Sequence, residues 1–362
     1  MKQPKILFLV NGPRHGPYGV RARGLVRHFC NVGGNILYRN NRLISLFKFL
    51  LYAVTYQCDF IYIINIAFSA AAAGFIAKLL TGKKLIIDAG DINHKLFKIM
   101  GVNPALCFLE KLMEERVLSA ADIIVVRGRY FKEYLQAKGY KNVYYIPDGV
   151  DVSQFYPKDN QRLKNKIAPK GELVVGLVGS LMWSEPLKYC YGSDLIEALN
   201  ILKAEPVKAV IIGDGNGKKH LKEKAAQYGI ADRVVFAGTL PYDNLPEYIN
   251  VMDLCLSTQL NDITGWVRTP GKLPLYLACG KYIISTDVGD ARYVLPDEMR
   301  LAYDGLKDAG YPKRLSGAIL KILHNKTLLN KADSSRDTAE EEFDYKKLSQ
   351  RLETIILEHN NV

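Results

Sequence analysis

The stretch of residues 207–294 constrains the fold of this chain more than any other feature. It holds three short apolar runs, at 209–213, 233–239 and 251–257, with polar segments of helical spacing between them. Strands that alternate with helices predict a parallel sheet covered by helices on both faces. In such a sheet, ligands bind beyond the carboxyl ends of the strands, so the loops that follow these runs are where we expect a binding site.

The first half of the chain repeats the alternation, and 362 residues suffice for two domains. A polar, lysine-rich stretch at 159–171 predicts an interdomain linker, and the apolar spacing after residue 345 predicts a last helix. We therefore predict an α/β protein with an N-terminal domain of residues 1–165, a C-terminal domain of residues 166–335 and a terminal helical segment of residues 336–362. The strand-like runs of the first domain are 5–10, 35–38, 59–64, 84–88, 122–126 and 143–146.

The net charge of +12 lies in the first part of the chain. Residues 1–150 hold 21 Lys and Arg against 9 Asp and Glu, whereas the remainder holds 28 of each. A basic domain predicts an anionic partner such as a membrane surface. Nucleic acid is not expected, because no aromatic single-strand platform or recognition helix stands out. A solvated basic face without a partner is the alternative.

Two apolar segments raise the question of membrane contact. Residues 60–77 carry no charge, but a β-branched run followed by an alanine-rich run predicts a buried strand and a buried helix rather than a span. Residues 38–52 combine bulky apolar side chains with Arg39, Arg42 and Lys48, which is typical of a helix in a membrane interface; a plain core helix is the alternative.

The cysteines and the N-terminus indicate the compartment. Six scattered cysteines, with no close pair, favour a reducing compartment and no zinc or disulfide framework. The apolar run at 6–10 is too short for a signal peptide. We expect a cytoplasmic protein, peripheral on the cytoplasmic face of the membrane.

Three further pieces give the chain a recognisable signature. Residues 145–151 read Tyr-Ile-Pro-Asp-Gly-Val-Asp, residues 155–157 read Phe-Tyr-Pro, and residues 272–280 begin Lys-Leu-Pro-Leu-Tyr. Together with the 207–294 pattern, they resemble the retaining glycosyltransferases of the GT-B fold, family four. The resemblance implies two Rossmann-like doubly wound domains that face a cleft, with the last helix crossing back to the first domain.

The resemblance also implies an activity. A family member transfers a sugar from a nucleotide-sugar donor to an acceptor with retention of configuration, and the basic first domain suggests a lipid-linked or cell-surface saccharide as the acceptor. The nucleotide-sugar is a substrate, so no cofactor is expected, and no Asp-x-Asp loop suggests a metal.

On the donor side, the resembling motif places Lys272 near the diphosphate, where a cation stabilises the charged leaving group; a solvated loop lysine is the alternative. Strand-end amides are expected at the phosphates, a loop at the base, and Lys188, Lys218, Arg268 or Arg292 in place of lost phosphate contacts. The donor-binding set is Gly179, Ser180, Lys188, Gly238, Thr239, Leu240, Tyr242, Thr269, Pro270, Gly271, Lys272 and Leu275.

Three positions depart from the family pattern. Ser180 stands where the family has an arginine, and Tyr191 stands where it has a lysine. The paired glutamates would fall at Val267 and Leu275, and leucine cannot accept the hydrogen bond that the second glutamate receives from the ribose. These departures support a second hypothesis, a catalytically impaired homologue that acts as a binding or scaffolding partner of an active transferase. A nucleotide-sugar 2-epimerase is a third, and it would need several carboxylates in the cleft.

On the acceptor side, residues 84–94 resemble the family's strand that ends in polar residues facing the sugar. Asp91 and His94 are the predicted catalytic residues, and Asp88 is as well suited to capping the next turn. The glycine-rich loop and the helix after it are expected to receive a lipid-linked phosphate, with plain surface charge as the alternative. The predicted acceptor-binding residues are Arg14, His15, Gly16, Arg21 and Arg23.

Overall fold

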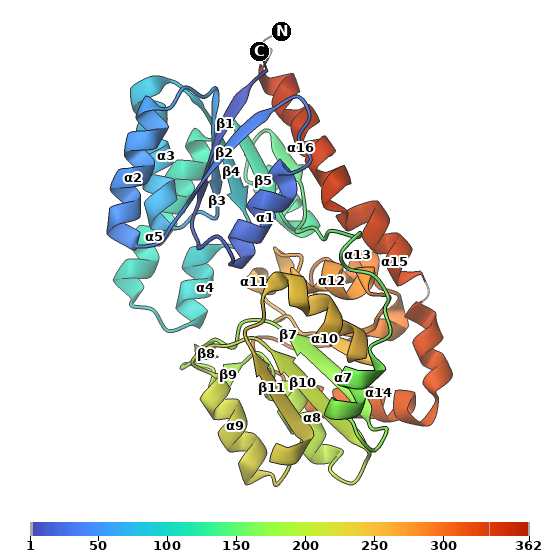
Figure 1. Cartoon of the computed structure of the whole chain (residues 1–362). Helices are drawn as coiled ribbons and strands as arrows, with labels where there is room; N and C mark the ends of the chain where they lie inside the picture. Colours follow the sequence, from blue (N-terminus) through green and yellow to red (C-terminus); the bar gives the residue numbers. More distant parts are fainter. Residues whose placement is uncertain (1–2, 333, 361–362) are drawn as a thin grey trace.

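The computed structural model describes residues 3–332 and 334–360 and contains two six-stranded parallel sheets, one in each half of the chain (Figure 1). The first sheet has the strand order β2-β1-β3-β4-β5-β6, and every pair in it is parallel. Its strands are β1 (Lys5–Val10), β2 (Gly33–Tyr38), β3 (Phe60–Ile64), β4 (Lys84–Ala89), β5 (Ile123–Val126) and β6 (Val143–Tyr145).

Helices cover both faces of this sheet. They are α1 (Pro17–Val26), α2 (Arg42–Thr55), α3 (Phe68–Thr81), α4 (Asn93–Ile99), α5 (Pro104–Ala120) and α6 (Arg129–Ala137). Successive side chains of a strand point to opposite faces, and β1 follows this rule. Leu7 and Leu9 belong to the core that includes α2 and α3, whereas Ile6 and Phe8 belong to the core that includes α1 and the last helix.

The segment without charges folds as the sequence predicts. It forms the fully buried strand β3 and most of the helix α3, whose alanines pack on the sheet. Within the described residues, no helix is both long and apolar enough to cross a membrane. The segment 38–52 forms most of α2, and the side chain of Asn41 caps this helix by accepting from the backbone N–H of Leu43.

The second sheet has the order β11-β10-β7-β12-β13-β14 and is also parallel. Its strands are β7 (Leu173–Val178), β10 (Val207–Ile212), β11 (Val234–Gly238), β12 (Leu254–Ser257), β13 (Tyr282–Thr286) and β14 (Arg300–Leu301), and β8 (Trp183–Ser184) pairs with β9 (Tyr189–Cys190) in a separate hairpin. The α-helices after β6 are α7 (Gln161–Ile167), α8 (Ser193–Ile201), α9 (Lys218–Gln227), α10 (Leu245–Val251), α11 (Ile263–Trp266), α12 (Lys272–Ala278), α13 (Ala291–Val294), α14 (Tyr311–His324), α15 (Ser335–Thr338) and α16 (Tyr345–Asn360).

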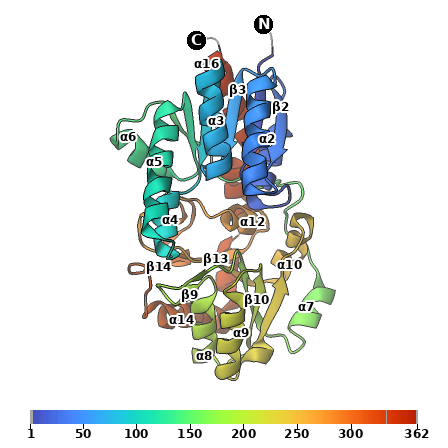
Figure 2. The ribbon, with the colours of Figure 1, turned by 90° about the vertical axis from the view of Figure 1, so that its left-hand side faces the viewer.

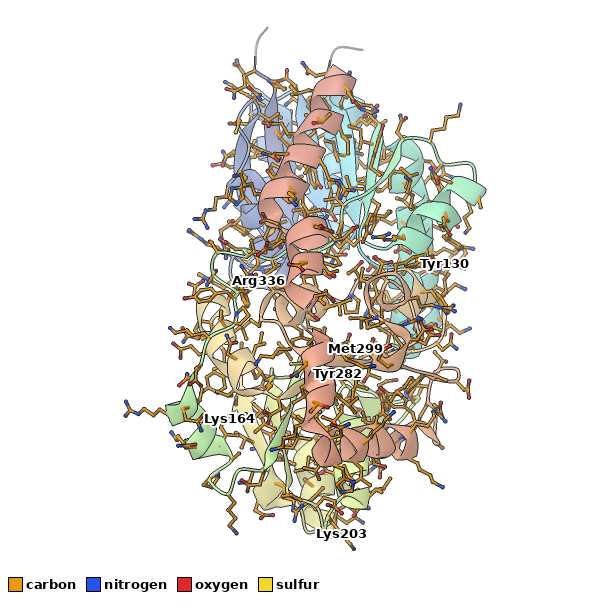
Figure 3. The ribbon with its side chains drawn as sticks, turned by 90° about the vertical axis from the view of Figure 1, so that its right-hand side faces the viewer. Tyr130, Lys164, Lys203, Tyr282, Met299 and Arg336 are labelled. Atoms are coloured by element: carbon orange, nitrogen blue, oxygen red, sulfur yellow. The ribbon has the colours of Figure 1, made fainter. Side chains whose placement is uncertain are left out.

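The last helix, α16, belongs to the first domain. Leu348, Leu352 and Ile356 are fully buried and complete the core on the α1 side of the first sheet. Figure 3 shows the helix running along the first domain after the chain has left the second. This crossing is the one that the resemblance implies.

The chain crosses between the domains at two adjacent points. The backbone N–H of Val150 donates to the carbonyl of Phe343 over 2.8 Å, and the N–H of Tyr345 donates to the carbonyl of Val150 over 3.0 Å. Val150 and Phe155 already pack in the core of the second domain. The predicted boundary at residues 165/166 falls inside α7, so the structural transition lies nearer residue 150.

Candidate active site between the domains

The carboxyl ends of the two sheets face each other across a close domain contact (Figures 1 and 2). Val267, in the loop between α11 and α12, is fully buried in the core of the first domain. A Cβ on Gly128 would lie 2.3 Å from the carbonyl oxygen of Val267, so only glycine fits there. This docking places Arg268 and the start of α12 opposite the end of β4.

A cluster of cations lies at the end of β7. The ammonium of Lys272 is 3.5 Å from the ring centroid of Tyr191, and a Cβ on Gly179 would lie 3.5 Å from the same ammonium. Burial, and then the charge of Arg268, lower the pKa of Lys272 well below its ordinary value. Within residues 3–332 and 334–360, no carboxylate lies within ion-pair distance of Lys272, so its ammonium has no counter-ion there.

Two further donors of this cluster are buried without a partner. The Nε of Arg268 and the hydroxyl of Tyr191 make no hydrogen bond to any residue that the structure describes. Buried donors are rarely left unpaired in folded proteins. Together with Lys272, they form a site that is chemically suited to an anion with several oxygens, such as a diphosphate.

Arg268 connects this cluster to the first domain. Its guanidinium pairs with the carboxylate of Asp91, which follows β4. Tyr18, at the start of α1, lies nearby: burial, and then the charge of Asp91, raise its pKa to about 12. The predicted catalytic residue Asp91 therefore lies in the cleft, at the point where the two domains meet.

The buried ion cluster beneath the cleft overturns one sequence-based prediction. Asp88 accepts hydrogen bonds from Arg21 (2.7 Å), Arg127 (3.0 Å) and Tyr62 (3.0 Å). Arg21 is 0% exposed and also donates to the carbonyls of Ile146 and Pro147. The prediction that Arg21 binds the acceptor is therefore wrong, because its guanidinium holds β4 and the end of β6 together.

The other predicted acceptor residues lie on the surface beside the cleft. Arg14 and His15 are exposed, and Gly16 is the residue that precedes α1. Arg23 is half-buried, and its guanidinium donates to the carbonyl of Arg14, which ties the loop to the helix. Four of the five residues thus remain accessible, and their role in acceptor binding stays a prediction.

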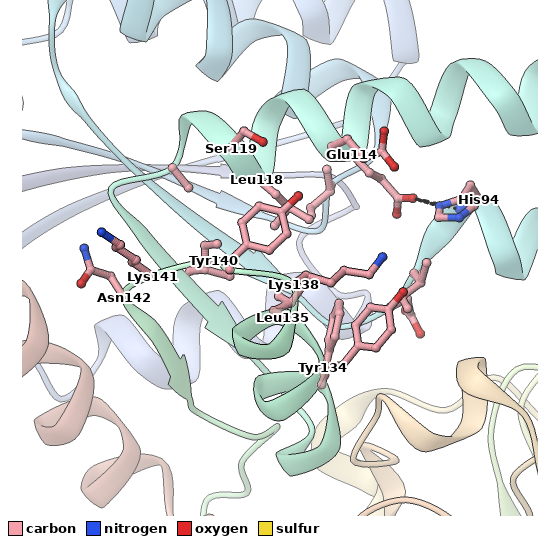
Figure 4. A pocket seen from close by; sticks show the side chains of 18 residues that line it. His94, Glu114, Leu118, Ser119, Tyr134, Leu135, Lys138, Tyr140, Lys141 and Asn142 are labelled. Carbon is pink, nitrogen blue, oxygen red and sulfur yellow. Dashed lines mark hydrogen bonds and ion pairs between the residues drawn. The ribbon is translucent and has the colours of Figure 1, made fainter.

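His94 lies beside the cleft in a pocket of about 740 Å³ formed by α4, α5, α6 and the loop before β6 (Figure 4). Its Nδ1 pairs with Glu114, which also accepts from the backbone N–H of Asn93 over 2.5 Å. Burial raises the pKa of Glu114 to about 7 and lowers the pKa of His94. Tyr134 and Lys138 line the same pocket (Figure 4), and Asp91 is also among the residues that line it.

Three predicted donor residues are engaged elsewhere. The hydroxyl of Thr269 is buried against Asp290 and the carbonyl of Arg127, so it supports the domain contact. Leu275 is 6% exposed and packs in the core of the second domain. Lys188 is exposed on the β8–β9 hairpin and pairs with Glu185. The structure therefore does not favour direct contact between these three side chains and a nucleotide-sugar.

The remaining donor residues lie in loops at the ends of strands. Gly213, directly after β10, has φ 132°, and a Cβ there would lie 1.8 Å from the carbonyl oxygen of Gly179, so this close approach requires glycine. Gly238 also has positive φ. Tyr242 packs on Phe155 with ring centroids 5.0 Å apart. Gly179, Ser180, Gly238, Thr239, Leu240, Pro270 and Gly271 are placed at these strand ends and at the turn before α12.

Sequence reasoning missed Arg127, Tyr18 and Asp290. Asp290 accepts from the backbone N–H of Arg129 over 2.9 Å and from the hydroxyl of Tyr145 over 2.8 Å, across the domain contact. Arg127 directly follows a predicted strand, and this position is a signal that could have found it. No group of three or more His, Cys, Asp or Glu side chains that could hold a metal occurs in the described part of the chain.

Sequence comparisons find a matching family for the second domain and relatives that match part of the chain. Residues 172–325 match the model of the family described as glycosyl transferases group 1. The chain is 27% identical to a D-inositol 3-phosphate glycosyltransferase of Acidothermus cellulolyticus over 231 residues, which is 58% of this chain and 48% of the relative. It is 26% identical over 288 residues to the phosphatidylinositol N-acetylglucosaminyltransferase gpi3 subunit of Schizosaccharomyces pombe, covering 76% of this chain and 54% of the relative. The chain thus spans about half the length of the curated relatives it matches.

Solved structures match over nearly the whole chain. The HepE protein of Anabaena in complex with UDP and glucose superposes with a TM-score of 0.76 at 17% identity, covering 98% of this chain and 99% of that one. Sucrose-phosphate synthase of Thermosynechococcus elongatus superposes with a TM-score of 0.78 at 15% identity, covering 99% of each chain. The fold is therefore GT-B, as predicted. Residues 172–325, which make up most of the second domain, match the family that the sequence signature resembles.

Proposed function

We propose that the protein transfers a sugar, with retention, from a nucleoside diphosphate sugar to a lipid-linked or cell-surface saccharide at the membrane. The observation that carries this proposal is Lys272, a partly buried lysine without a carboxylate partner among the described residues, at the end of β7 beside Arg268. In a GT-B protein this is where a leaving diphosphate needs positive charge. HepE was solved with UDP-glucose, which makes UDP the first nucleotide to test.

The chemistry required of the site is modest. The bond between the anomeric carbon and the diphosphate breaks, and a bond to the acceptor oxygen forms on the same face of the sugar. The acceptor's proton passes to an oxygen of the departing diphosphate. Lys272 and Arg268 then stabilise the charge that develops on the leaving group, while Asp91 and His94 lie on the side where the acceptor enters.

The test is calorimetric binding of UDP, GDP, ADP, TDP and CMP, each followed by its common sugar conjugates. We expect one nucleotide to bind with micromolar affinity. If the folded protein binds none of them, the proposal fails and the non-catalytic partner becomes the better hypothesis. Burial of Leu275 and Val267 where the family has glutamates is the observation that favours this second candidate.

A large exposed apolar surface supports the membrane part of the proposal. Thirteen large hydrophobic side chains on α2, α3 and α5 are exposed, and Phe47 (70%), Leu79 (69%) and Leu109 (59%) are among the most exposed on their helices. Figure 2 shows the three helices side by side on one side of the first domain. We call this surface the three-helix face: Leu43, Ile44, Phe47, Leu51, Tyr52, Phe68, Ile76, Leu79, Leu80, Leu106, Phe108, Leu109 and Leu112.

Charge favours a lipid surface as the occupant of the three-helix face. Neither α2 nor α3 contains an acidic residue, and Lys48 is exposed on α2. Of the acidic residues of α5, Glu110 and Glu114 are buried, and the exposed Glu115 pairs with Lys111. An apolar surface flanked by cations binds anionic bilayers by combining burial of apolar side chains with electrostatic attraction.

The double variant Phe47→Glu/Leu79→Glu is expected to lose at least about tenfold in affinity for vesicles of anionic phospholipid, because each change puts a carboxylate into the interface. Co-sedimentation measures this, and Ile201→Glu, a similar change at a 52% exposed residue of the second domain, should bind as wild type does. Equal binding by the double variant, or none by wild type, would refute the membrane assignment. A wild-type dimer that the double variant abolishes would instead identify a second copy as the occupant.

A further inference from the structure

The ion pair between Asp91 and Arg268 joins two groups that the proposed reaction needs separately. Arg268 belongs to the cation cluster of the second domain, and Asp91 lies at the end of β4 on the acceptor side. The pair is largely buried, since the side chains are 26% and 17% exposed. While the two are paired, the guanidinium has fewer donors free for a diphosphate, and one oxygen of the carboxylate is not free to accept from an acceptor.

The charges around the pair do not balance. Asp91 pairs with Arg268, and no carboxylate of the described residues lies within ion-pair distance of Lys272. The Nε of Arg268 is buried without a partner among the described residues, as is the Tyr191 hydroxyl. A diphosphate carries more charge and more oxygens than a carboxylate, and guanidinium binds such oxyanions in a bidentate manner. The cluster is therefore better matched by a diphosphate than by Asp91.

We propose that Asp91 competes with the donor's diphosphate for Arg268, so that donor binding transfers the guanidinium to the diphosphate and frees the Asp91 carboxylate to face the acceptor. This inference rests on the proposed function and adds regulation to the same site. The exchange couples the two substrates: the acceptor side gains its carboxylate only after the donor has bound. Because the pair spans the domains, the exchange also loosens one of the contacts that hold the cleft together.

The exchange predicts a result that would not be expected if Asp91 acted only as a catalytic residue. Asp91→Asn removes the competing charge, so UDP should bind about fivefold to tenfold more tightly than to wild type. Transfer should nevertheless slow, because the amide cannot serve as the carboxylate does. Arg268→Gln should weaken UDP binding by roughly tenfold or more, because charge-assisted hydrogen bonds to the diphosphate are lost.

Calorimetry of the full-length protein with UDP separates the outcomes. In the Asp91→Asn/Arg268→Gln double variant, the gain from Asp91→Asn should disappear, because no guanidinium remains to compete for. Glu358→Gln makes the same charge change near the end of α16, away from the cleft, and should leave UDP affinity unchanged.

If UDP binds wild type but Asp91→Asn binds it no more tightly, or Arg268→Gln binds it equally well, the exchange is refuted while the proposed function stands. A gain that persists in the double variant refutes it as well, since it would reflect net charge rather than competition for Arg268. If no nucleotide of the panel binds either wild type or Asp91→Asn, the proposed function fails together with the exchange.

Discussion

Replacement of Asp88 by alanine is expected to lower the free energy of unfolding by about 3–5 kcal/mol, because it leaves Arg21 and Arg127 charged and buried with only the more distant and partly exposed carboxylate of Asp148. Denaturation in urea, followed by circular dichroism, measures the loss. Asp159→Ala, at an exposed residue before α7, is the matched control and should change stability by less than about 0.5 kcal/mol. A loss below about 1 kcal/mol for Asp88→Ala would mean that the two arginines find other partners.

The same cluster gives this stabilisation a pH dependence. Burial by itself raises the pKa of Asp88, but Arg21 and Arg127 outweigh burial and hold the pKa below its ordinary value. The contribution is therefore fully present above the carboxyl pKa of the unfolded chain and is lost as the pH falls through the lower value of the folded protein. Asp88→Ala should accordingly be less sensitive than wild type to acid in that range.

Replacement of Lys272 by methionine is expected to lower kcat/KM by about 10²–10³-fold, the effect of removing one preorganised group that stabilises developing charge. Methionine keeps most of the apolar volume beside Tyr191 and Gly179 but removes the ammonium. Since burial and Arg268 disfavour that charge, the thermal midpoint should stay unchanged or rise. Loss of activity without loss of stability identifies a functional rather than a structural lysine.

Transfer assays with the donor found by calorimetry measure this effect. Lys203→Met is the control, because Lys203 is exposed at the far end of the second domain (Figure 3) and should not affect transfer. Unchanged turnover by Lys272→Met would remove Lys272 from the site. A fall in thermal midpoint that matches the loss of activity would mean that the lysine serves the fold.

The fold was predictable because it rests on local patterns. The β-branched run of β3 and the alanine-rich run of α3 each identify a buried element by its period and composition. The burial of Arg21 could have been predicted from the same patterns. Arg21 and Leu25 are four residues apart and share the buried face of α1 with Ala22, so helical spacing alone indicates that Arg21 points inward.

Much of the site could not be predicted from the sequence, because its groups come together only through the contact between the domains. Asp91 and Arg268 are 177 residues apart, and nothing local to either one indicates the other. Tyr191 was identified as a departure from the family pattern, but its contact with Lys272 depends on how the β8–β9 hairpin returns to β7. Val267 stands where the family has a glutamate, and its packing into the first domain explains why an apolar residue is suited to this position.

The placement of α16 has a consequence for how the chain is made on the ribosome. The first domain is synthesised first, yet Leu348, Leu352 and Ile356, which cover one face of its sheet, are translated after the whole second domain. At about 5–20 residues per second, synthesis of the second domain leaves that face uncovered for roughly ten seconds or more before α16 is made. During this interval the nascent first domain exposes the apolar face that α16 later covers, and a fragment that stops before α16 is expected to aggregate rather than fold.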